Sequence, residues 1–208
     1  MTLTEPMQTR QGARDAVLAA AERLLRERPL HELSVADLIE AAAISRSSFY
    51  AHFGSKTAVI AECLSQVLDQ ITLAFAPLHA RAGGDDLEIA IRGSVQRWVA
   101  VCERHGALLR AVSEQWPHDE RLRELWSGML ATVAAGTARV VRDARAAGRA
   151  PSGADPLALA ACLTWGFERV LHVSLAGGAA GLPQPAAIAE PLAQMMLGGL
   201  FGAAPDWP

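Results

Sequence analysis

The segment of residues 34–56, SVADLIEAAAISRSSFYAHFGSK, constrains the fold more than any other part of this 208-residue chain. Ser34 precedes apolar residues with helical spacing, and Asp37 follows it by three positions. This is the pattern of a capping box, in which the hydroxyl and the carboxylate each accept a backbone N–H at a helix start. Ser45 is a second candidate N-cap, before the helical pattern of Arg46–Phe53. The segment therefore predicts two short helices.

The turn and the end of the second helix are also predicted by residue type. Ala43–Ile44 is the candidate turn, which asks a residue with a Cβ to adopt a backbone conformation that suits glycine. Phe49 and Phe53 are four positions apart, so both should face the core. Gly54 is expected to end the helix, because glycine readily adopts positive φ.

The remaining side chains of the segment fit contacts with nucleic acid. Hydroxyl, phenol and imidazole groups donate hydrogen bonds to phosphate oxygens, and helix N-termini add N–H groups with a favourable dipole. Arg46 lies near the N-terminus of the second helix and is the best candidate to contact bases, whereas Lys56, the only lysine in the chain, is a candidate for phosphate. The predicted DNA contacts are Ser34, Ser45, Arg46, Ser47, Ser48, Tyr50, His52 and Lys56.

This segment resembles the DNA-binding domain of TetR-type regulators. That signature combines a Ser or Thr cap, a turn before Ser, the pattern Tyr-x-His-Phe, a small linker and Lys, and Phe49-Tyr50-Ala51-His52-Phe53 matches its centre. Two positions depart from it: Ala43 replaces the usual Gly and Phe49 the usual Leu. The resemblance implies a helix-turn-helix protein that binds a double-stranded DNA operator as a dimer.

Three further stretches resemble one branch of that family, the ethionamide-activation repressors. They are ERPLHELSV at residues 27–35, AISRSSFYAHF at 43–53 and RELWS at 123–127. Outside the motif, the resemblance rests on length, helix count and apolarity. It implies a repressor that releases its operator when a small hydrophobic effector binds.

Composition limits the mode of DNA binding. The net charge is −3, which argues against a protein that coats nucleic acid through bulk positive charge. Residues 1–60 carry seven Lys or Arg and seven Asp or Glu, so DNA binding there must depend on the placement of charges. The three cysteines, Cys63, Cys102 and Cys162, lie far apart in apolar helical patterns and are expected to be reduced core thiols.

Helical periodicity extends over the whole chain, and no segment alternates like a strand. We expect an all-α fold of about nine helices, with a DNA-binding domain at 1–56, a connecting helix at about 55–76, and an effector-binding and dimerisation domain at 57–208. The other expected helices cover about 11–27, 85–103, 106–112, 119–147, 156–175 and a last one to about 201. Pro77 with residues 81–86 marks a break, and Pro191 either kinks the last helix or follows its start near Glu190.

The C-terminal domain suggests two surfaces. The last two helices are apolar on more than one face, which predicts a four-helix dimer interface or, alternatively, burial within one monomer. Three tryptophans on different helices could converge on an apolar effector cavity, or could be ordinary core residues. The predicted effector contacts are Ile91, Val95, Trp98, Trp126, Met129, Thr164, Trp165 and Phe167.

Other classes of protein have little support. No zinc-protease, nucleophile-elbow, P-loop or dinucleotide motif is present, so we expect neither an enzyme nor a cofactor or metal. The N-terminus lacks an apolar signal segment and no run reaches about 18 apolar residues, which favours a cytoplasmic protein without a membrane span. A helical interaction protein without DNA binding, and an enzyme whose site is assembled from distant residues, remain the alternatives.

Overall fold

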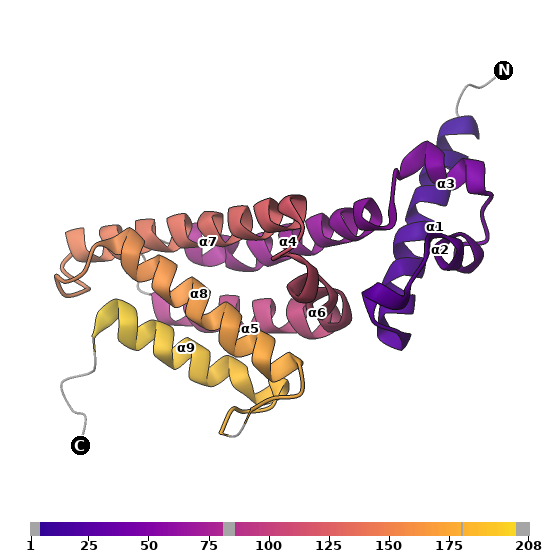
Figure 1. The fold of residues 1–208 in the computed structure, drawn as a ribbon. Helices are drawn as coiled ribbons and strands as arrows, with labels where there is room; N and C mark the ends of the chain where they lie inside the picture. Colours follow the sequence, from indigo (N-terminus) through magenta and orange to yellow (C-terminus); the bar gives the residue numbers. More distant parts are fainter. Residues whose placement is uncertain (1–4, 81–85, 180, 203–208) are drawn as a thin grey trace. The chain divides into compact units, whose positions relative to one another are not determined.

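The computed structural model describes residues 5–80, 86–179 and 181–202, and within them it contains nine α-helices, one 3-10 helix and no strand (Figure 1). The all-α prediction is confirmed. The helices are α1 (Glu5–Glu27), η1 (Leu30–Glu32), α2 (Val35–Ala41), α3 (Arg46–His52), α4 (Lys56–Ala80), α5 (Leu87–Arg104), α6 (Gly106–Gln115), α7 (Glu120–Ala146), α8 (Pro156–Leu175) and α9 (Pro185–Phe201).

The chain forms two compact units. The head unit comprises the residues up to Val67 together with Ala107–Leu125, and the body unit comprises Leu68–Gly106 together with the residues from Trp126 onward. Helix α4 runs through both units without interruption. The structure thus assigns α6 to the head unit, which sequence periodicity did not predict. The predicted division of DNA binding and effector binding at residue 56 concerns function and stays a prediction.

In the head unit, α1 packs on α2 and α3. Side chains from all three helices and from the start of α4 form the core, because each helix turns an apolar stripe inward. The buried residues include Val17, Leu18, Ala21, Leu24, Leu25, Leu38, Phe49, Phe53, Val59 and Ile60. Arg14 of α1 forms an ion pair with Glu62 of α4, and this pair ties the first helix to the connecting helix.

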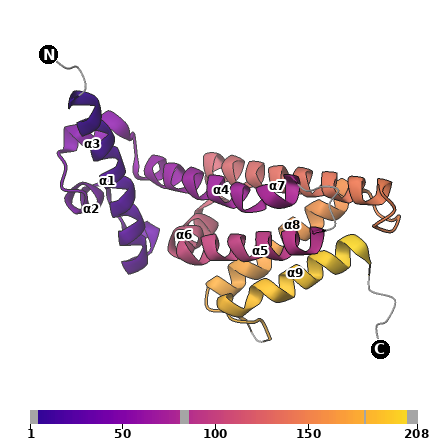
Figure 2. The same ribbon diagram turned by 180° about the vertical axis from the view of Figure 1, so that it is seen from behind.

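In the body unit, α9 packs against both α5 and α8 (Figure 2). Small residues permit close helix packing: Ala134 and Ala138 of α7 form a cluster with Ala160 of α8. Arg92 of α5 pairs with Glu190 of α9, which adds a charged contact at the surface of that packing. The larger buried side chains of α9 are Ile188, Leu192, Met196 and Leu200.

Two predicted helix boundaries are wrong, and one of the two alternatives for the last helix is excluded. Helix α1 begins at Glu5 instead of about 11, with Pro6 in its first turn, where a missing N–H leaves no gap in the helix. Helix α4 passes Pro77 and ends at Ala80, and its last turn is anchored by the fully buried Leu78. Helix α9 starts at Pro185, so Pro191 lies inside it and does not mark its start. The predicted break at 81–85 lies outside the described residues.

Two whole-chain predictions also need correction. Cys63 and Cys102 are buried, and burial raises the pKa of both thiols, but Cys162 is exposed on α8 and is not a core thiol. Helix α4 is long and apolar enough to cross a membrane by length and composition, contrary to the expectation of no such run. About half of its apolar window, 56%, is buried in the protein, which is typical of a core helix.

Candidate nucleic-acid interface

The start of α2 is fixed by the predicted capping box. Ser34 accepts a hydrogen bond from the Asp37 N–H at 3.2 Å, and the Asp37 carboxylate accepts from the Ser34 N–H at 2.7 Å. The Ser34 hydroxyl also donates to Asp37 at 2.6 Å, and Arg28 donates to the same carboxylate at 3.2 Å. The Ser34 hydrogen bonds, with a smaller contribution from Arg28, lower the pKa of Asp37 to about 2. Ser34 therefore fixes the start of α2 through contacts within the protein, without DNA.

The turn between the two helices has the predicted conformation. Ala43 has φ of 53°, in the left-handed region, which costs a residue with a Cβ roughly 1–2 kcal/mol. Arg23 of α1 donates to the Ala41 carbonyl at 3.0 Å, at the C-terminus of α2. Sequence reasoning missed this contact, because no local pattern links residues 18 positions apart. The turn is strained, but α1 supports it.

Helix α3 is capped as predicted and exposes its N-terminal end. Ser45 accepts from the Ser48 N–H at 3.1 Å, and its hydroxyl lies 2.9 Å from that of Ser47. Ser45 and Ser47 are exposed and Ser48 is half-buried. The hydroxyl groups of Ser45 and Ser47 thus lie together at the first turn of the helix, which is an arrangement that can bind phosphate oxygens.

Arg46 and Tyr50 form an exposed pair on α3. The Arg46 guanidinium lies over the Tyr50 ring, 5.6 Å from its centroid, and the phenol is 48% exposed. The ring also packs edge-on against the fully buried Phe49. This stacking fixes the direction of a guanidinium whose donors match the acceptors of guanine in the major groove.

The end of α3 differs from the prediction. Phe53 leaves the helix with an extended backbone (φ −132°, ψ 127°), and its buried ring packs beside Phe49 at 5.9 Å. Gly54 is not among the described glycines with positive φ, so it does not end the helix through a left-handed turn. The helix therefore ends at an extended residue whose side chain is buried, and not at a left-handed glycine. His52 is half-buried beside Phe53.

Lys56 has a structural role that the sequence did not predict. Its half-buried ammonium donates to the carbonyl oxygens of Leu30 at 2.8 Å and Leu33 at 2.5 Å. These carbonyls belong to η1 and the residue that follows it, so the lysine joins the start of α4 to the segment before α2. Ser55 caps α4, because its hydroxyl accepts a hydrogen bond from the Ala58 N–H at 3.1 Å.

The predicted effector contacts divide between the interior and the surface. Ile91 and Val95 are fully buried on α5, and Trp98, Trp126, Met129 and Phe167 are nearly so. Thr164 is half-buried, and its hydroxyl donates to the Ala160 carbonyl of its own helix at 2.8 Å. Trp165, however, is 42% exposed, so the three indoles do not all point inward. Helical spacing places Trp165 next to Thr164 but on another face, which the sequence alone could not orient.

The body unit also contains two half-buried titratable groups with shifted pKa values, Glu168 and His79. Burial raises the pKa of Glu168 on α8, and the same group adds to the elevated pKa of Cys102. Burial, with a smaller contribution from Arg139, lowers the pKa of His79 at the end of α4. Among the described residues, no cluster of three or more His, Cys, Asp or Glu side chains could hold a metal ion.

Comparisons with known proteins identify both parts of the chain. A model of the bacterial regulatory proteins of the TetR family matches residues 17–63, and a model of the C-terminal domain of the transcriptional regulator EthR matches residues 91–202. The HTH-type transcriptional regulator EthR of Mycobacterium tuberculosis is 33% identical over 187 residues, which cover 90% of this chain and 86% of the relative.

Solved structures share the fold at lower identity. The fatty acid degradation regulator FadR from Bacillus halodurans has a TM-score of 0.73 and 16% identity, covering 90% of this chain and 96% of that one. A complex of SmeT with triclosan has a TM-score of 0.67 and 20% identity, covering 94% and 98%. The chain belongs to the TetR family of bacterial transcriptional regulators and carries a C-terminal domain of the EthR type.

Proposed function

We propose that this regulator binds an inverted-repeat operator as a homodimer, represses transcription from it, and is released by a small hydrophobic effector. The observation that carries the DNA part is the stacked Arg46–Tyr50 pair on the exposed face of a capped α3, whose opposite face is anchored by the buried Phe49. Such a helix can enter the major groove with its N-terminal end directed at base edges. Action on DNA in a bacterium implies a cytoplasmic location.

The proposed contacts have distinct roles. Arg46 contacts a base, while Tyr50, His52 and the hydroxyls of Ser45, Ser47 and Ser48 contact phosphates. Lys56 has two of its three ammonium donors directed at carbonyl oxygens, so one donor is available for a phosphate. Ser34, whose hydroxyl bonds to Asp37, contributes through the N-terminus of α2.

The homodimer is proposed to form through α8 and α9. Both helices are mostly apolar and still expose apolar residues to solvent. These are Cys162 and Trp165 of α8 and Met195 and Gly198 of α9. Exposed apolar residues on two such helices are typical of a subunit interface, and an isologous pairing would form a four-helix bundle. The two copies of α3 would then meet DNA about 34–36 Å apart or at a multiple of that distance.

The dimer is tested by Trp165→Glu, with Ile89→Glu as the matched control, because Ile89 is 68% exposed and lies on α5, which is not one of the two proposed interface helices. Sedimentation equilibrium should show dissociation of the first variant and a dimer for the second. A monomeric wild type, or equal behaviour of the two variants, would refute the interface.

DNA reading is tested on the segment that flanks the protein's own gene. Arg46→Ala should relax preference at one base position of each half-site, at a cost of roughly 1–3 kcal/mol. Arg121→Ala, a change of an exposed arginine at the start of α7, is the control and should leave binding unchanged. A footprint over one asymmetric half-site occupied by a single protomer would contradict the proposal.

The effector is proposed to bind among Trp98, Trp126, Met129 and Phe167, with Ile91, Val95 and Thr164 completing the site. These residues supply an apolar surface with one hydroxyl, and SmeT, a neighbour of the same fold, has been solved with a small molecule, triclosan. Binding should lower operator affinity by about 1–3 kcal/mol, and DNA should weaken effector binding by the same factor. A compound seen by crystallography at these residues that leaves operator affinity unchanged would refute the coupling.

A further inference from the structure

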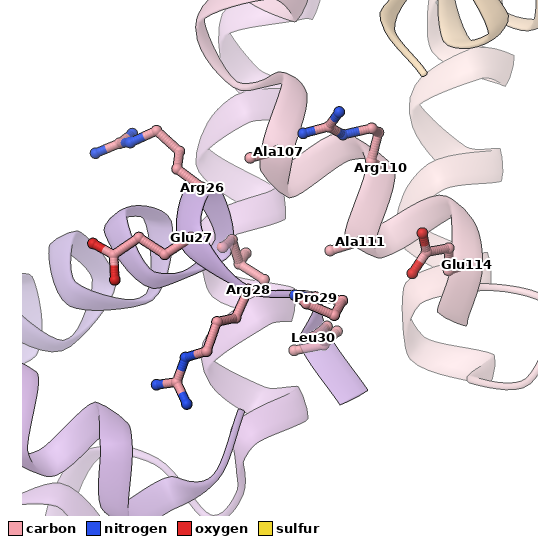
Figure 3. A pocket seen from close by; sticks show the side chains of 10 residues that line it. Arg26, Glu27, Arg28, Pro29, Leu30, Ala107, Arg110, Ala111 and Glu114 are labelled. Atoms are coloured by element: carbon pink, nitrogen blue, oxygen red, sulfur yellow. The ribbon is translucent and has the colours of Figure 1, made fainter. Parts of the chain in front are cut away.

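A pocket in the head unit lies apart from the proposed DNA and effector contacts. It has a volume of about 290 Å³ and is formed by the end of α1, the following residues to Leu30, and α6 (Figure 3). Its lining residues are Leu25, Arg26, Glu27, Arg28, Pro29, Leu30, Ala107, Arg110, Ala111 and Glu114. The volume is near the lower end of the range for ligand sites, about 300–1,000 Å³, so a small molecule would fit.

Buried apolar side chains form part of the pocket lining, and the edge on α6 carries both signs of charge. Leu25, Leu30 and Ala111 are buried residues that line the pocket. On α6, Arg110 extends along one edge of the pocket, and the Glu114 carboxylate lies at another edge (Figure 3). The two residues are four positions apart on one helix, so their side chains emerge on the same face. Arg110 and Glu114 form no ion pair with each other in the described structure.

The other charged residues of the lining do not compete for a ligand there. Arg26 and Glu27 turn away from the pocket (Figure 3). Arg28 also points away, and it donates to Asp37. The charges available to an occupant are therefore one guanidinium and one carboxylate, on α6 beside the buried side chains of Leu25 and Leu30.

We propose that this pocket binds a zwitterionic α-amino acid with a bulky apolar side chain. The ligand carboxylate pairs with Arg110 and its ammonium with Glu114, while the side chain covers Leu25, Pro29 and Leu30. A ligand with a single net charge leaves one of the two α6 side chains opposite a like charge or without a partner, and a purely apolar ligand uses neither.

Two contacts link the pocket to the helix-turn-helix. The Leu30 carbonyl accepts from Lys56 at the start of α4, and Arg28 pairs with Asp37 in the cap of α2. An occupant that packs on Leu30 thus touches the segment that positions both ends of the motif. The head unit would then have a ligand site of its own, separate from the effector site proposed for the body unit.

The test compares three probes by ligand-observed NMR titration with the full-length protein. L-Phenylalanine should bind about two- to fivefold more tightly than phenethylamine, which lacks the carboxylate, and 3-phenylpropionate, which lacks the ammonium, since exposed ion pairs contribute little each. Arg110→Gln and Glu114→Gln should each weaken the binding of L-phenylalanine by a similar factor. The matched controls Arg121→Gln and Glu124→Gln, exposed charges on α7 outside the pocket, should have no effect.

The location is tested with ¹³C-methyl-labelled leucine. L-Phenylalanine should shift the methyl signals of Leu25 and Leu30, together with Leu33 through the shared lysine contact, and should leave Leu192 and Leu200 of α9 unchanged. Ala107 is a half-buried residue of α6 that lines the pocket, so Ala107→Trp should fill the pocket and abolish these shifts. Equal binding of the three probes, shifts confined to α9, or no binding of L-phenylalanine would each overturn the proposal.

Discussion

The pair of helices α2 and α3 differs from the pair α8 and α9 in how its geometry is fixed. In the first pair, Ser34 and Ser45 cap the helices through residues three positions away, and Phe49 anchors the motif. In the second pair, long apolar helices pack through small residues, as where Gly199 lies against Leu163. Local polar contacts determine the first arrangement, whereas the second depends on which face meets which neighbour. The comparison suggests that the first pair should respond sharply to single changes that the second tolerates.

The largest expected effect is that of Phe49→Ala. Removal of this fully buried ring should lower the free energy of unfolding by about 3–5 kcal/mol, because the small head core cannot close the cavity. Trp165→Ala is the counterpart on α8 and should cost no more than about 1 kcal/mol at protein concentrations where dimerisation does not contribute. Urea denaturation followed by circular dichroism measures both. Equal losses would remove the contrast between the two helix pairs.

Lys56→Met should have the next largest effect. The change leaves the carbonyls of Leu30 and Leu33 without their donor, which should cost about 1–3 kcal/mol of stability. Arg121→Met, which removes an exposed cation, should stay within about 0.5 kcal/mol. In DNA titrations Lys56→Met should also reduce the salt slope by about 1 per half-site. Unchanged stability would mean that the ammonium serves DNA alone.

Ala43→Gly should stabilise the protein by about 0.5–1 kcal/mol. Glycine adopts the φ of 53° without the Cβ clash, and this gain exceeds the entropy that glycine loses on folding. Ala42→Gly is the matched control, since Ala42 has φ of −86° and should lose about 0.5–1 kcal/mol. Thermal unfolding of the two variants should shift in opposite directions, and a shared direction would contradict strain at the turn.

The smallest effect should be the acid titration of Asp37, whose carboxylate is exposed to solvent. Its pKa of about 2 lies below the usual value near 3.8, so its contribution to stability is complete above about pH 4 and is lost as the pH falls toward 2. Carboxyl NMR should show that Ser34→Ala raises this pKa more than Arg28→Met does, because the serine contacts lower it most. The reverse order would assign the shift to the ion pair.

The sequence predicted the head better than the body for a physical reason. The caps at Ser34 and Ser45 and the strained turn at Ala43 depend on neighbours within a few positions, so residue order reveals them. The contacts of Lys56 with residues more than 20 positions away leave no local pattern.

In the body, helical spacing predicted the α-helices but not their orientation about their own axes. Trp98 and Trp126 lie on helices with polar and apolar faces and proved buried, whereas Trp165 lies on the mostly apolar α8 and proved exposed. A helix that is apolar all round gives no sign of which face meets the core, so a dimer-facing residue and a core residue look alike in sequence.

Helix α4 has a close contact near each of its two ends, so a small tilt at one end displaces the contacts at the other. At one end, the Lys56 ammonium donates hydrogen bonds to the carbonyl oxygens of Leu30 and Leu33. Near the other end, the His79 ring lies so close to Gly136 of α7 that a Cβ on this glycine would be 2.3 Å from the ring. The imidazole therefore has no room to move toward α7. A helix of 25 residues is about 37 Å long. A tilt of about 5° at the His79 end therefore moves the Lys56 end by about 3 Å, roughly one base-pair rise along DNA.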